Sequence, residues 1–122
     1  MAFEASDAIV VFMTATSVEE AQHLAEKLVE AELAACVQIL PQVQSIYRWK
    51  DKVERQAEIL LIAKTLRSRF PELEREVRRV HSYEVPEVAA AVLGEISQSY
   101  LDWLISAVGS SPMPNRRVDQ EA

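Results

Sequence analysis

The stretch of residues 34–65 constrains the fold more than any other part of the chain, because it is typical of two strands too long for one small domain to cover. Residues 35–49 make up its first arm, the polar residues 50–52 turn the chain, and residues 53–65 return rich in Ile and Leu. Strands of globular proteins are usually about five or six residues long, so this hairpin would project beyond its own core. We expect another copy of the chain to cover it, with Tyr47 and Trp49 near the tip in that interface.

Length and charge limit what the chain can be. At 122 residues it fits a single domain that needs no disulfide or metal to fold. The formal net charge of −6 argues against a nucleic-acid or anionic-membrane partner, since both attract Lys and Arg. Cys36 is the only cysteine, which excludes an internal disulfide and fits a reducing cytoplasm. Residues 1–7 lack the basic start and apolar block of a signal peptide.

The order of patterns along the chain predicts the fold class. A short apolar run at residues 9–13 indicates a buried strand, and Ser17 with Glu20 marks the start of an amphipathic helix to about residue 31. After the hairpin, Pro71 opens a second helix. Residues 88–93 then read as a short strand, and a last helix begins at Ser97 or Ser99 and stops at Gly109.

This order predicts an α+β fold, a ferredoxin-like βαββαβ sandwich with a long hairpin between its second and third strands and an extra C-terminal helix. Residues 1–109 would form this domain. Residues 110–122, with two prolines and no periodicity, predict a disordered tail.

Several kinds of catalytic or binding site are disfavoured by the residues present. Two glycines, Gly94 and Gly109, are too few for a phosphate-binding loop. Residues 53–65 carry no aromatic side chain, so the base stacking of RNA-binding sheets is not supported. A Cys36 nucleophile with His81 as base is conceivable, but a cysteine in an apolar strand is more often only packed. We expect no enzyme.

Metal binding has few candidate ligands. His23 is on the polar face of the first helix, where a solvated side chain explains it. His81 ends the second helix and begins a polar turn, although a helix C-terminus stabilises a histidine in any case. Met13 and Cys36 are the remaining soft candidates. Without the close Cys/His spacing of a structural zinc site, any metal would be held loosely or between subunits.

Two charged residues flank the apolar residues 59–63 of the long hairpin. Glu58 and Lys64 could lie at strand ends with their heads in water, the interpretation we prefer for Glu58. Alternatively they line a cleft between subunits with His81 and Tyr83. For Lys64 the two interpretations stand equal.

Four separated segments together resemble the CutA family of divalent-cation tolerance proteins: LAACV (33–37), SIYRWK (45–50), EILLIAKT (58–65) and HSYEVPE (81–87). The resemblance extends over residues 8–108. It implies a ferredoxin-like protomer in a tight homotrimer, in which the long hairpins extend the sheets of neighbouring subunits. It also implies a link to tolerance of copper and other divalent cations, without a catalytic reaction.

The resemblance also suggests ligands. Some bacterial members have a cysteine where this chain has Met13, and a histidine pair where it has Val80 and His81. His81 therefore keeps its residue, and Cys36 matches the family motif. We expect a cytoplasmic, non-enzymatic homotrimer that binds copper(II) or another divalent cation weakly, through His81, Met13 and Cys36, with no cofactor tightly bound. The alternative is a sensor similar to the PII signalling proteins, with a small molecule bound in an intersubunit cleft lined by Lys64, Tyr83 and Glu58.

Overall fold

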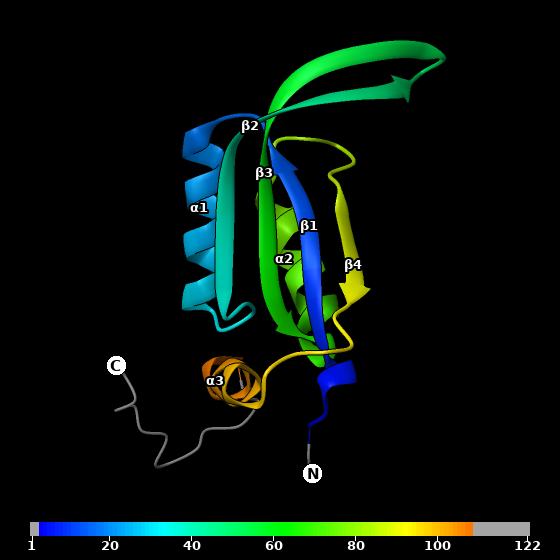
Figure 1. Ribbon diagram of the computed structural model, residues 1–122. Helices are drawn as coiled ribbons and strands as arrows, with labels where there is room; N and C mark the ends of the chain where they lie inside the picture. Colours follow the sequence, from blue (N-terminus) through cyan, green and yellow to red (C-terminus); the bar gives the residue numbers. More distant parts are fainter. Residues whose placement is uncertain (1–2, 109–122) are drawn as a thin grey trace.

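The computed structural model describes residues 3–108, so the predicted tail and the helix stop at Gly109 lie outside the described residues. Seven main elements follow one another: β1 (Ala8–Ala15), α1 (Val18–Glu30), β2 (Cys36–Trp49), β3 (Lys52–Leu66), α2 (Phe70–Val80), β4 (Val88–Val92) and α3 (Gln98–Val108). The strands form one antiparallel sheet in the order β2-β3-β1-β4 (Figure 1). The predicted α+β plan is confirmed, with the long hairpin and the additional last helix.

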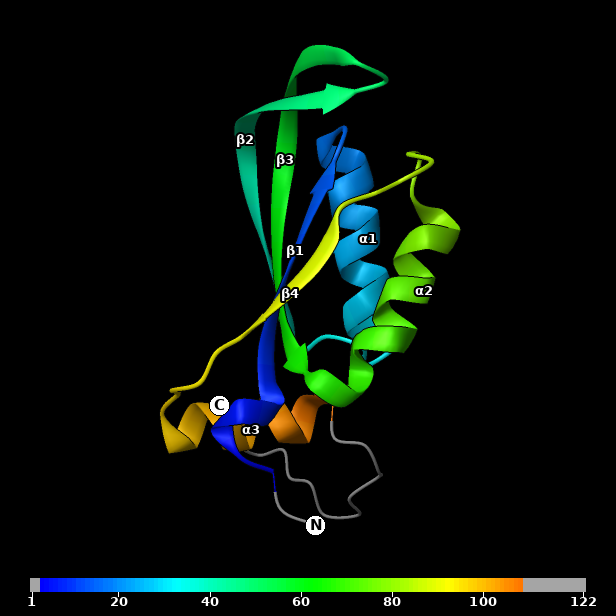
Figure 2. The same cartoon turned by 90° about the vertical axis from the view of Figure 1, so that its right-hand side faces the viewer.

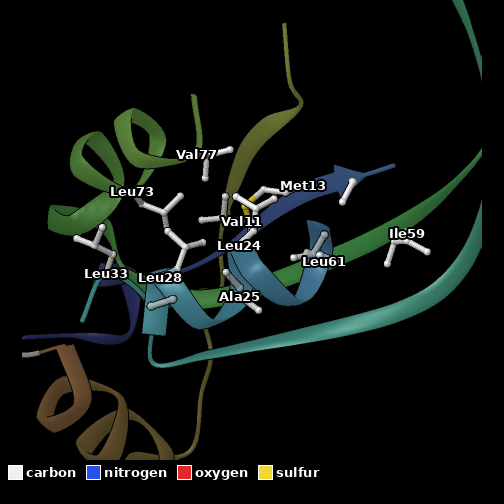
Figure 3. Packing of buried hydrophobic residues seen from close by; sticks show 14 of the residues in the cluster. Val11, Met13, Leu24, Ala25, Leu28, Leu33, Ile59, Leu61, Leu73 and Val77 are labelled. Carbon is white, nitrogen blue, oxygen red and sulfur yellow. The ribbon is translucent and has the colours of Figure 1, made fainter. Parts of the chain in front are cut away.

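The core lies between one face of the sheet and two helices. α1 and α2 pack side by side on that face, while α3 lies across one end of the sheet (Figure 2). Alternate residues of β1 and β3 point into this layer, where Val11, Met13 and Leu61 are fully buried against Leu24 and Leu73 (Figure 3). A period of two in the strands and of 3.6 in the helices produces this apolar layer.

α1 begins where the sequence predicted. The Glu20 N–H donates to the Ser17 hydroxyl over 3.1 Å, as an N-cap requires. The Glu20 carboxylate does not return to Ser17. It accepts instead from the N–H and the hydroxyl of Thr16, each at 2.9 Å.

The hairpin of β2 and β3 extends well past the rest of the sheet. β1 pairs with β3 only as far as Ile59, so the distal half of β3 pairs with β2 alone. Lys50 and Asp51 at its tip have φ values of 50° and 67°, the left-handed pair of a two-residue hairpin turn. Large apolar side chains remain exposed along it: Ile46 (62%), Val53 (54%), Trp49 (40%) and Tyr47 (37%).

A β-bulge changes the faces of β2 halfway along the hairpin. Leu40 pairs with Leu60 and Val43 with Glu58, so β2 has one residue more than β3 in this interval. An extra residue reverses the side-chain alternation of the strand beyond it. Before the bulge, odd-numbered residues such as Ile39 pack against the core, and after it the odd-numbered residues share the face of Glu58.

Candidate functional site

A pocket of about 620 Å³ lies beneath the bend of the hairpin, at the end of the sheet where β1 ends. The connection between α2 and β4, residues 81–87, forms its other wall (Figure 1). Eleven residues line it: Thr14, Ser45, Ile46, Tyr47, Trp49, Glu58, Ser82, Tyr83, Glu84, Val85 and Glu87. Three of them are carboxylates and none is Lys or Arg. The bulge places Ser45, Tyr47 and Trp49 on this side of β2.

Glu58 lies inside this pocket and is only 6% exposed. The Ser45 hydroxyl donates to its Oε1, and the Tyr83 hydroxyl to its Oε2, both over 2.6 Å. The expectation that Glu58 sits at a strand end with its head in water is wrong. β3 continues beyond it to Lys52, and the two hydroxyl groups replace water around the carboxylate.

Tyr83 links the loop of residues 81–87 to the hairpin through its hydrogen bond to Glu58. Burial, and then its hydrogen bond to the Glu58 carboxylate, raise the pKa of the Tyr83 phenol well above its usual value. The phenol therefore remains a protonated donor across the physiological range. The predicted association of Tyr83 with Glu58 is present within a single chain.

His81 anchors the same loop to β1. Its Nδ1 accepts the N–H of Tyr83 over 2.9 Å, and its Nε2 lies 2.7 Å from the carbonyl oxygen of Thr14. Since Nδ1 accepts, Nε2 carries the proton and donates to Thr14. The side chain is 0% exposed. Both ring nitrogens are thus engaged, and a metal could bind His81 only after one of these bonds is broken.

Glu20 ties the loop to the start of α1. Its Oε2 accepts the N–H of Ser82 over 2.8 Å and lies 3.7 Å from Nδ1 of His81. Burial by itself raises the pKa of Glu20, but the N–H groups of Thr16 and Ser82 and the Thr16 hydroxyl outweigh it and lower the pKa to about 2. Glu20 is therefore a fixed negative charge behind the loop.

The other predicted metal ligands lie apart from His81. Met13 is 0% exposed within the apolar core. Cys36 is partly exposed at the start of β2, at the opposite end of the sheet from the pocket. Within residues 3–108, no group of three or more His, Cys, Asp or Glu residues could hold a metal ion. The three predicted ligands therefore do not fit a metal site within one chain.

Lys64 also lies away from the pocket, so its predicted grouping with Tyr83 is not found within one chain. Its Nζ donates to Oε1 of Gln38 over 2.7 Å, across the β2–β3 ladder. Lys64 is six positions along β3 from Glu58, a distance of about 20 Å. The pocket is thus acidic, without a basic residue to balance its carboxylates.

Tyr47 and Trp49, expected in a subunit interface, are exposed side chains at the pocket's outer edge. The Tyr47 hydroxyl donates to Oε1 of Gln56 over 2.6 Å. Four residues of this site are not among those that the sequence predicts for it: Thr14, Glu20, Ser45 and Ser82. Ser82 belongs to the polar run of residues 81–87, which is visible in the sequence. Thr14, Glu20 and Ser45 reach the site only through contacts with residues far away in the sequence.

Comparisons with known proteins agree with one another. Residues 9–107 match the sequence model of a family described as CutA1 divalent ion tolerance protein. The chain is 45% identical over 100 residues to the divalent-cation tolerance protein CutA of Thermus thermophilus, covering 82% of this chain and 97% of that protein. It is 43% identical over 96 residues to the chloroplastic protein CutA of Arabidopsis thaliana, covering 79% of this chain but 53% of that protein.

Comparison of the fold with solved structures also finds similarity to CutA1 proteins. The crystal structure of CutA1 from Oryza sativa superimposes with a TM-score of 0.83 at 38% identity, covering 88% of this chain and all of that one. No helix within residues 3–108 is both long and apolar enough to span a membrane.

Proposed function

This chain belongs to the CutA1 family of divalent ion tolerance proteins, and from this premise we propose that it works as a homotrimer in the response to divalent cations. The observation that carries the proposal is the hairpin of β2 and β3. Its exposed Ile46, Tyr47, Trp49 and Val53 have no cover within the described chain. Apolar side chains clustered in this way usually mark a contact with another protein.

The site at the bend of the hairpin supports the same proposal. The pocket is built from the part of the hairpin that leaves the sheet, so an adjoining subunit would close its open side. Sedimentation velocity at micromolar concentration tests the assembly, with a trimer expected. Disruption by a charged residue at the tip, Trp49→Glu, should give smaller species, whereas Trp103→Glu on α3 serves as the control for an exposed tryptophan outside the hairpin.

We propose further that copper(II) or another divalent cation binds weakly, with His81 as the imidazole ligand. Of the three predicted ligands, only His81 lies among polar groups, beside Glu20 and Thr14. Weak affinity follows from its hydrogen bonds, because the Nδ1 bond to Tyr83 must break before that nitrogen can bind a cation.

Calorimetric titration with copper(II) tests this site. His81→Ala should weaken binding, while His23→Ala on the exposed face of α1 should leave it unchanged. Thermal unfolding would establish that both variants are folded. Equal affinities of His81→Ala and the parent would remove His81 from the site, and loss of binding in His23→Ala alone would indicate adventitious binding at the surface.

We also propose that the protein is not an enzyme and acts in the cytoplasm. Cys36, the candidate nucleophile, lies on a different part of the sheet from His81, whose nitrogens are both engaged. Alkylation of Cys36 by iodoacetamide at the rate of an ordinary thiol is expected, and a strongly enhanced rate would contradict this. Cell fractionation checks the location.

A further inference from the structure

Glu58 is a buried carboxylate with no cationic partner among residues 3–108. Its carboxylate is covered by the hydroxyl groups of Ser45 and Tyr83, both neutral. Within residues 3–108, no Lys, Arg or His forms an ion pair with it. A buried carboxylate without a positive partner is costly, and such groups are normally paired or bind a cation. Each oxygen here has accepted only one hydrogen bond, so acceptor capacity remains.

The pocket around Glu58 combines negative charge with apolar surface. Glu84 and Glu87 add two further carboxylates, and Trp49 and Val85 add exposed apolar side chains. Its volume of about 620 Å³ is within the usual range for small organic ligands and is far larger than a single metal ion needs. Charge and shape therefore favour a ligand that has both a cationic group and an apolar body.

We propose that this pocket binds a small organic cation, an ammonium or guanidinium group on an apolar body, with Glu58 accepting hydrogen bonds from the cation. This activity goes beyond tolerance of divalent metal ions. The apolar body packs against Tyr47 and Trp49 at the outer edge. The cationic group reaches Glu58 and gives its carboxylate the charged donor that residues 3–108 do not supply.

The tryptophan at the mouth of the pocket is already within reach of one cation. The Nζ of Lys50 lies 5.7 Å from the centre of the Trp49 ring, within the range of a cation–π contact. Lys50 is at the exposed hairpin tip, where its ammonium group can leave the ring at little cost. The apolar body of a ligand can then lie against the indole while the N–H groups of its cationic end point to the carboxylates.

Fluorescence of Trp49 provides a direct readout. Trp103 is the second tryptophan of the chain, and Trp103→Phe leaves Trp49 as the only indole emitter. Titration of this protein with phenethylammonium chloride, in buffer with EDTA to remove divalent metals, should change the Trp49 emission in a saturable way. 2-Phenylethanol, the neutral analogue, should not. The EDTA separates this test from the proposed metal binding.

Charge-matched variants identify Glu58 as the acceptor. Glu58→Gln should weaken binding of phenethylammonium by about ten- to hundredfold, because it removes a charged hydrogen-bond partner. Glu26→Gln, an equal change of charge on the exposed face of α1, should bind as the parent does. Trp49→Ala, measured by calorimetry, gives a second variant that removes the apolar contact, and sedimentation together with thermal unfolding establishes that this variant is folded and assembled as the parent is.

Three results would overturn the proposal. These are no saturation up to about 10 mM, a level that already corresponds to negligible affinity, equal binding of the neutral analogue, or parent-like binding in both Glu58→Gln and Trp49→Ala. Sedimentation of Glu58→Gln adds one further outcome. Loss of assembly in this variant, together with no binding of phenethylammonium to the parent, would assign the pocket to a basic side chain of a neighbouring copy.

Discussion

At the residue scale, three side chains fix the loop of residues 81–87 between the sheet and α1. Tyr83 donates to Glu58 on β3, His81 bridges Thr14 and the Tyr83 N–H, and the Glu20 carboxylate accepts from Ser82. The hydrogen bond between Tyr83 and His81 is local, whereas each of the other bonds joins residues more than twenty positions apart in the sequence. This loop forms one wall of the pocket. Because residues 81–87 contain no helix or strand, a few polar contacts hold that wall in place.

Removing the Tyr83 hydroxyl should loosen this wall. Tyr83→Phe deprives the buried Glu58 carboxylate of one of its two donors, so we expect a loss of about 1–2 kcal/mol in the free energy of unfolding. Urea denaturation gives the measurement. Tyr47→Phe is the matched control, because its hydroxyl bonds the neutral Gln56 on the exposed hairpin. An equal loss in both variants would contradict a special role of the Tyr83 bond.

Glu20 makes stability depend on pH. Its pKa in the folded protein is about 2, below the ordinary value of 4.5, so the ionised carboxylate stabilises the folded state above pH 4.5. That contribution is lost as the pH falls from about 4.5 toward 2. The Glu20 side chain is 14% exposed, so solvent screening reduces the effect. The lowered pKa then contributes on the order of 2 kcal/mol to the free energy of unfolding near pH 7.

Glu20→Gln lacks this contribution at every pH. The difference in unfolding free energy between the parent and Glu20→Gln should be full at pH 7 and shrink below pH 4.5. Glu19→Gln, exposed in the same turn of α1, should behave as the parent. A difference that stays constant down to pH 2.5 would show that the Glu20 charge is not the stabilising feature.

At the element scale, the bulge in β2 decides which side chains reach the pocket. If the same sequence paired continuously from Leu40 without a bulge, Gln42 would lie opposite Glu58, and the even-numbered residues beyond it would share the face of Glu58. Ser45, Tyr47 and Trp49 would then turn to the other face. A single irregularity in pairing thus links the hairpin sequence to the composition of the site.

Deletion of Gln42 tests whether the bulge is a single extra residue. In the shortened strand Pro41 can lie opposite Ile59, while Val43 stays opposite Glu58 and Ser45 opposite Gln56, so the hydrogen bond from Ser45 to Glu58 should remain and the unfolding free energy should change by less than about 1 kcal/mol. Gln42→Ala keeps the register and should change stability by less than about 0.5 kcal/mol. Crystal structures of both variants would show the register. Loss of the contact of Ser45 with Glu58 after the deletion would contradict this assignment of the bulge.

The elements themselves could be predicted from sequence, whereas the network around Glu58 could not. The cap at Ser17 and Pro71 at the start of α2 are local signals, and each marked a helix correctly within one or two residues. The burial of Glu58 depends on how far β3 continues and on which loop meets it. That information lies in contacts 13 and 25 residues away in sequence, with Ser45 and Tyr83.

At the scale of the whole molecule, residues 3–108 leave apolar surface uncovered on the open face of the sheet and along the hairpin. α1 and α2 cover one face of the sheet (Figure 2). Phe12, Leu60 and Ile62, which alternate with the core residues of β1 and β3, point to the opposite face and remain only partly buried. The hairpin adds its own exposed apolar side chains beyond the sheet. Of the exposed hairpin side chains, Ile46, Tyr47 and Trp49 also line the pocket at Glu58. A homotrimer would bury them, and it would make the pocket part of a subunit boundary.

Sedimentation equilibrium of the full chain over a range of micromolar concentrations tests this central claim most directly. Three copies of a 13.8 kDa chain give a particle of about 41 kDa, which should persist on dilution because the buried surface is apolar. Thermal unfolding at the same concentrations would establish that the protein remains folded. A folded species of 13.8 kDa at these concentrations would contradict the account, because it would show that the hairpin needs no second copy.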